Sequence, residues 1–95
     1  MSNHPPGLNL RTVKVIEVVR RYRRWTIDIH FRDENAEKFI LNSYQFKYQA
    51  RREAIAVARW QSHNQPFPIQ LHVKDRRGVI REHNTYGTDP PETEG

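Results

Sequence analysis

The fold of this chain is decided by one stretch, VKVIEVV-RRYRR-WTIDIHFR, which covers residues 13–32. Its first part, residues 13–19, is rich in β-branched side chains, which favour strands. Its last part, residues 25–32, places an apolar side chain at every second position, the period of a half-buried strand. The stretch therefore predicts a β-hairpin whose tip, Arg20–Arg24, carries four arginines around Tyr22.

The remaining sequence predicts one helix and three more strands. The segment from Lys47 to Ser62 has no Gly or Pro and is dense in Ala and Arg, which predicts a helix, and Pro66 would stop it. With a first strand at about residues 10–20, further strands are expected at 37–42, 67–74 and 79–83, with a turn at Asp75–Gly78. The predicted fold class is α+β: an antiparallel sheet of four to five strands with one helix packed on one face, in the order β-β-β-α-β-β.

The chain is long enough for one domain with a modest core. We expect this domain to cover residues 10–86, between a flexible N-terminus at 1–9 and a flexible acidic tail at 87–95.

In the fourth strand, Phe67 and Val73 should face inward. The predicted core residues shared by the second strand, the helix and the fourth strand are Trp25, Ile27, Ile29, Ala54, Ala58, Ile69 and Leu71.

Charge is distributed unevenly along the sequence. All 16 Lys and Arg fall within residues 11–86 together with eight of the 11 acids, so this part has a formal charge of +8, whereas the tail from Gly87 carries −3. A basic domain favours polyanions or acidic surfaces as partners. The alternative is a solvated basic surface without a specific ligand.

The composition argues against several other classes of protein. There is no cysteine, which excludes disulfides and thiol catalysis and fits a cytoplasmic protein. No apolar run reaches membrane-spanning length, so no membrane partner is expected. The five histidines lack the short spacing of a metal site, and no nucleophile pattern accompanies them. We therefore expect no enzyme: no catalytic residue, no metal and no cofactor.

The second half of the chain carries sequence motifs similar to those of a known protein family. The predicted helix contains Glu53-Ala54-Ile55 with Ala58, and the predicted last hairpin continues into the segment 78–90, GVIREHNTYGTDP. With these motifs and Trp25 early in a strand, the chain resembles a small bacterial family catalogued as domain of unknown function 2188. The resemblance implies an α+β fold and a bacterial or phage origin. It implies no activity, because the family has none assigned.

The arginine tip is the leading candidate site. Arginine makes bidentate contacts with phosphates and guanine edges, and Tyr22 can stack on a base or a sugar. The alternative is a charged tip that only keeps a sheet edge soluble. The candidate nucleic-acid-binding residues are Arg20, Arg21, Tyr22, Arg23, Arg24, Arg32, Lys74, Arg76 and Arg77.

Polar residues of two predicted strands form a second candidate surface. One face of the second strand carries Thr26, Asp28, His30 and Arg32, and one face of the fourth carries Gln70, His72 and Lys74. If the strand order brings these faces together, they form a polar, partly basic platform. On that platform we expect His30 and His72 to be a surface pair rather than metal ligands.

Trp60 lies about 120° away from the alanine face of the predicted helix. It either packs under the Pro66-Phe67 turn or, with Val57, forms an apolar surface for self-association or for a protein partner, since Trp is a frequent interface anchor. A homodimer is therefore one expectation.

Two functions from different classes follow from these features. The leading hypothesis is a small non-catalytic domain that binds nucleic acid, DNA or RNA, through the arginine-rich hairpin. The alternative is a protein-interaction module that binds an acidic surface of a partner, for example an inhibitor of a nucleic-acid-handling protein. The basic tip does not separate them, because carboxylates and phosphates are bound by the same side chains.

Overall fold

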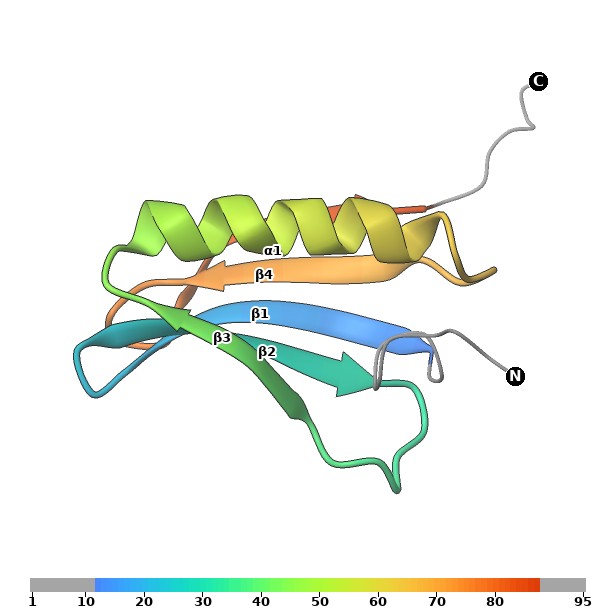
Figure 1. Ribbon diagram of the computed structural model, residues 1–95, viewed down its shortest axis with the longest axis horizontal. Helices are drawn as coiled ribbons and strands as arrows, with labels where there is room; N and C mark the ends of the chain where they lie inside the picture. The colour runs from blue at the N-terminus through green and yellow to red at the C-terminus, as the bar shows by residue number, and fades with distance from the viewer. Residues whose placement is uncertain (1–11, 88–95) are drawn as a thin grey trace.

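A computed structural model describes residues 12–87 and shows a five-stranded sheet covered on one face by one helix (Figure 1). The elements are β1 (Val13–Arg21), β2 (Arg24–Phe31), β3 (Phe39–Tyr44), α1 (Lys47–Ser62), β4 (Ile69–Lys74) and β5 (Ile80–Tyr86). The predicted α+β class is confirmed, and the helix has its predicted bounds. The predicted flexible N-terminus, and the predicted acidic tail beyond Gly87, lie outside the described residues.

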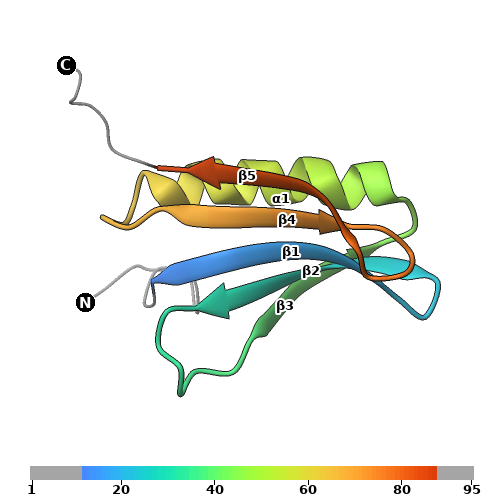
Figure 2. The same cartoon turned by 180° about the vertical axis from the view of Figure 1, so that it is seen from behind.

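The sheet is mixed, which corrects the predicted antiparallel arrangement. Its strand order is β3-β2-β1-β4-β5; β1 and β4 are parallel, and the other three neighbouring pairs are antiparallel. Parallel neighbours need a crossover connection, and α1 carries the chain back across one face of the sheet. Because β1 and β4 run in the same direction, the turns that follow them lie at the same end of the molecule (Figure 2).

The core lies between α1 and the sheet. All seven predicted core residues are buried, together with Ile16 and Val18 of β1. On the helix, the side chains turned to the sheet are small: Ala50, Ala54 and Ala58 are fully buried. Small side chains there allow the helix to pack close to the sheet. No helix among residues 12–87 has the length and apolarity to span a membrane.

Phe67 is exposed, which corrects its predicted inward orientation. The strand begins only at Ile69. Pro66 and Pro68 flank Phe67 and have no backbone N–H to donate to a neighbouring strand, so hydrogen-bonded pairing does not extend this far. The ring of Phe67 is instead covered by Arg32, whose Cζ lies 4.4 Å from the ring centroid.

Candidate nucleic-acid interface

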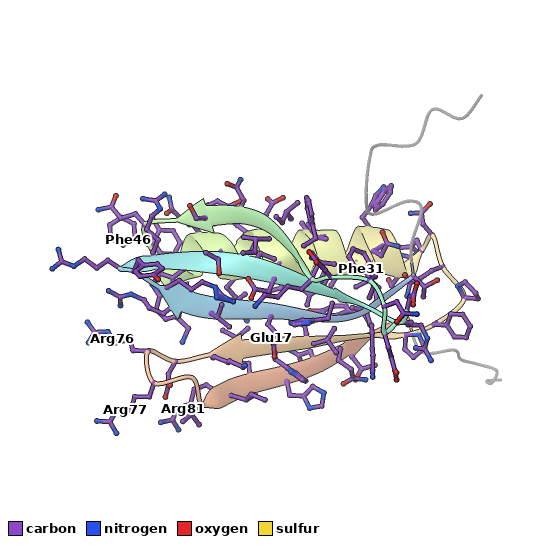
Figure 3. The ribbon with its side chains drawn as sticks, turned by 90° about the horizontal axis from the view of Figure 1, so that it is seen from below. Glu17, Phe31, Phe46, Arg76, Arg77 and Arg81 are labelled. Atoms are coloured by element: carbon purple, nitrogen blue, oxygen red, sulfur yellow. The ribbon has the colours of Figure 1, made fainter. Side chains whose placement is uncertain are left out.

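The parallel pairing of β1 and β4 gathers basic residues at one end of the molecule. The β1–β2 turn, the β4–β5 turn and the start of α1 all lie there (Figures 1 and 2). Figure 3 shows the face of the sheet that α1 leaves open. In this view Arg76, Arg77 and Arg81 lie at this end of the molecule, and Phe31 lies toward the opposite end. We call this region the basic end. Its cations are Arg20, Arg21, Arg23, Arg24, Lys47, Lys74, Arg76, Arg77 and Arg81.

The hairpin tip closes through a two-residue turn. Arg21 pairs with Arg24, which leaves Tyr22 and Arg23 as the loop. Both loop residues have positive φ, 49° and 71°, a conformation that costs energy for any residue with a Cβ and for which hairpins favour Asn-Gly. The Tyr22 side chain is 96% exposed, so no packing offsets this cost. Neither the backbone nor the core explains why these two residues stand here.

Arg21 is held by the open face of the sheet rather than free to bind a ligand. It forms an ion pair with Asp28, whose side chain is only 1% exposed. The same carboxylate accepts a hydrogen bond from Thr26 Oγ1 at 3.1 Å and lies 3.4 Å from Lys38 Nζ. Asp28 is thus a buried charge that needs Arg21 as its counterion.

Glu17 is the centre of a second polar cluster on the open face (Figure 3). Its carboxylate oxygens lie 3.0 Å from His30 Nε2, 3.2 Å from Lys74 Nζ and 3.7 Å from His72 Nδ1. Burial alone would raise the pKa of the Glu17 carboxyl, but hydrogen bonds from Lys74 and His30 outweigh it and hold that pKa below its ordinary value. The strand order therefore creates the predicted polar platform, but the expected pairing of His30 with His72 is wrong. Strand β1 lies between their strands, and each histidine contacts Glu17 instead.

The same face brings together Glu17, Asp28 and His30, whose oxygen and nitrogen atoms lie within 4.8 Å of one another. Such a set has the chemistry of a metal site. However, Lys74 already neutralises Glu17, and Arg21 with Lys38 neutralises Asp28. A divalent cation would be repelled by these three charges, so we assign the cluster a structural role.

A cleft of about 380 Å³ opens at the basic end. Its lining residues are Trp25, Lys47, Asp75, Arg76, Arg77 and Arg81. Lys47 Nζ and Arg20 Cζ each lie 5.5 Å from the Trp25 ring centroid, within the range of a cation–π contact. The indole is thereby covered by two cations, which place positive charge at the edge of the cleft.

Asp75, the acid in the lining of this cleft, is engaged in shaping the β4–β5 turn. Its Oδ1 accepts hydrogen bonds from the backbone N–H groups of Arg77 and Val79, at 2.9 and 3.0 Å, and its Oδ2 accepts one from Arg81 Nε at 2.9 Å. The hydrogen bond from the Val79 backbone, with those from Arg81 and Arg77, holds the pKa of the Asp75 carboxyl below its ordinary value. Asp75 therefore offsets Arg81 and fixes the turn that presents Arg76 and Arg77.

Six cations at the basic end have no ion pair with any residue between 12 and 87: Arg20, Arg23, Arg24, Lys47, Arg76 and Arg77. Arg24 is positioned by β3, since its Nε donates to Ser43 Oγ at 3.0 Å. The first turn of α1 contains no acid, so the positive end of the helix dipole adds to the same field. The electrostatic potential of this end is therefore positive.

The nine predicted binding residues thus divide into three groups. Arg20, Tyr22, Arg23, Arg24, Arg76 and Arg77 lie together at the basic end; Arg21 and Lys74 lie there too but are ion-paired; Arg32 lies beyond β2, at the opposite end. Sequence reasoning missed Lys47 and Arg81, which join the cleft only through the strand order.

The predicted association surface is partly exposed: Trp60 is 47% accessible, whereas Val57 packs partly on the core.

No known protein family, curated protein or solved structure matches this chain. The resemblance to domain of unknown function 2188 therefore stays a prediction.

Proposed function

We propose that this protein is a small non-catalytic domain that binds nucleic acid, DNA or RNA, at its basic end. The observation that carries the proposal is the convergence of six cations, without an ion pair among the described residues, from two turns and the start of α1. Phosphate groups suit such a set, because arginine binds them in bidentate geometry and lysine as a point charge. Release of counterions from the polyanion would supply affinity without base recognition.

The ion pairs within the domain support the same proposal. Arg21 forms an ion pair with Asp28, Lys74 with Glu17 and Arg81 with Asp75. The carboxylates near the basic end are thus already balanced inside the domain. The charge of the six remaining cations is available to an external polyanion.

The test compares two double variants that lose the same charge. Arg76→Ala with Arg77→Ala removes two cations of the basic end, whereas Lys14→Ala with Arg59→Ala removes two exposed cations outside it. We expect the first to weaken DNA and RNA binding and to lower the slope of log affinity against log salt by about 0.7–0.9 for each phosphate that the variant no longer neutralises. The control should retain most of the wild-type affinity.

Two results would contradict the proposal. Equal loss of affinity in both variants would mean that net charge, and not the basic end, governs binding. A wild-type protein that retards neither DNA nor RNA at low salt would refute nucleic-acid binding altogether, and would favour the acidic surface of a partner protein as the ligand.

A further inference from the structure

Three exposed aromatic rings lie at the basic end beside its cations. Tyr22 at the hairpin tip is 96% exposed, Phe46 before α1 is 50% exposed, and Tyr48 in the first turn of α1 is 63% exposed. The rings of Phe46 and Tyr48 stack, with centroids 5.8 Å apart and planes inclined by 16°. These two rings form one aromatic platform next to Lys47.

Two of the three rings stand where the local backbone favours other residues. Tyr22 has a positive φ in a turn that prefers Asn-Gly. Phe46 is the N-cap of α1 and makes no side-chain capping hydrogen bond, at a position where Ser, Thr, Asp or Asn would satisfy a free helix N–H. Residues that break local rules without a packing gain are expected at functional sites.

The hairpin tip and the aromatic platform belong to neighbouring strands. Trp25 of β2 is paired with Tyr44 of β3, so the residues just before β2 and just after β3 leave the sheet at the same end. Tyr22 precedes β2, and Phe46 follows β3. Arg24 bridges the two strands by donating to Ser43 Oγ and to the Ser43 carbonyl, at 3.0 and 3.3 Å. The basic end therefore holds exposed rings and cations on neighbouring strands.

We propose that the basic end selects single-stranded nucleic acid, with unpaired bases stacked on Tyr22 and on the Phe46–Tyr48 platform. This inference rests on the proposed function and specifies its substrate class. Bases within a duplex stack on one another and expose only their edges in the grooves. Unpaired bases have free faces, and base–aromatic stacking together with a basic groove is the common mode of single-strand binding. Cations alone would bind duplex and single-stranded nucleic acid alike, but three exposed rings favour the single strand, whose unpaired bases can stack on them.

The experiment measures fluorescence anisotropy with labelled oligothymidylate, labelled oligouridylate and a labelled duplex of the same length. The variants are Tyr22→Asn, which tolerates the positive φ, Phe46→Ser, which supplies a better N-cap, and Tyr48→Ala. Phe67→Ala is the matched control, because Phe67 is a 43% exposed ring outside the basic end. Circular dichroism establishes that each variant is folded.

We expect the wild type to bind single strands more tightly than the duplex, and each of the three variants to lose on the order of tenfold in single-strand affinity. The salt dependence should not change, because the rings carry no charge, and Phe67→Ala should bind like the wild type. The two single-stranded probes show whether DNA or RNA is preferred. Tighter duplex binding, or three neutral ring variants, would overturn this inference while leaving the proposed function intact. Absence of binding to all three probes would overturn both.

Discussion

Arg21 and Asp28 form an ion pair on the open face of the sheet, so one arginine of the hairpin tip stabilises the fold instead of serving a ligand. Arg21→Ala should lower the free energy of unfolding by about 1–3 kcal/mol, because it leaves the buried Asp28 carboxylate with fewer partners. The exposed Arg23 is the control: Arg23→Ala should change stability by less than about 0.5 kcal/mol. Urea unfolding measures both, and equal stability of the two variants would contradict the structural role of Arg21.

Relieving the strain of the Tyr22–Arg23 turn should raise stability and weaken nucleic-acid binding. Replacing Tyr22 by Asn and Arg23 by Gly gives the preferred pair for two positive φ values, so the free energy of unfolding should rise by about 1 kcal/mol. Nucleic-acid affinity should fall, because the variant lacks one ring and one cation of the basic end. Thermal unfolding and anisotropy measure the two effects.

A glycine of the β4–β5 turn provides the opposite control. Gly78 has a φ of 86°, and a Cβ added there would meet no atom within 4 Å. Gly78→Ala should therefore lower the free energy of unfolding by about 1 kcal/mol through backbone strain alone. If the Asn-Gly variant were no more stable than the wild type, the turn would not be strained as its φ values indicate.

Glu17 should make stability depend on pH in the acid range. Its pKa is lower in the folded protein than the ordinary 4.5, so its contribution is complete above that value and is lost as pH falls through the folded pKa. Urea unfolding across this range should show a weaker pH dependence for Glu17→Gln than for the wild type. Asp75 and Glu82, whose pKa values are also lowered by hydrogen bonds, remain in both proteins, so the difference reports Glu17.

Exposed Glu34 supplies the control for this pH series, because its side chain forms no ion pair with any residue from 12 to 87. Glu34→Gln should follow the wild-type profile. Superimposable profiles for Glu17→Gln and the wild type would instead show that the Lys74 and His30 contacts do not favour the charged form of Glu17.

The helix flank at Trp60 stays a predicted self-association surface. Trp60→Glu should convert a dimer into a folded monomer and weaken binding to a long polyanion, since a dimer presents two basic ends to it. Sedimentation velocity gives the oligomeric state. Phe39→Glu, at a 41% exposed ring on the edge strand β3, should leave the dimer intact. A wild type that is monomeric at high concentration would exclude this surface as a dimer contact.

Side-chain periodicity predicted the layers of this fold well. Alternation along β2 identified the buried row from Trp25 to Ile29, and the alanine spacing of α1 identified Ala54 and Ala58 as its partners. Periodicity reports which face of a strand is buried. It failed at Phe67, where apolar alternation continued past the point at which two prolines remove the strand's hydrogen bonds.

Side-chain periodicity could not predict the strand order, and the position of the candidate site depends on that order. Nothing in the local pattern of β1 or β4 states that they pair in parallel, so Arg76 and Arg77 could not be placed beside Arg20–Arg24. The division of the arginines was hidden for a related reason. Arg21 and Arg23 are two residues apart and alike in sequence, yet only Arg21 shares a face with Asp28, because the turn sends Arg23 outward.

The parallel β1–β4 contact would also link the proposed polyanion binding to folding. The turn at Tyr22 and the turn at Arg77 are distant along the chain and come together only when the sheet is complete. The proposed polyanion, spanning both turns, would have no equivalent site on the unfolded chain, so its binding would stabilise the folded state. At a free concentration of 100 times its dissociation constant, such a ligand would add about 2.7 kcal/mol to the free energy of unfolding, which would slow cleavage by proteases that attack only the open form.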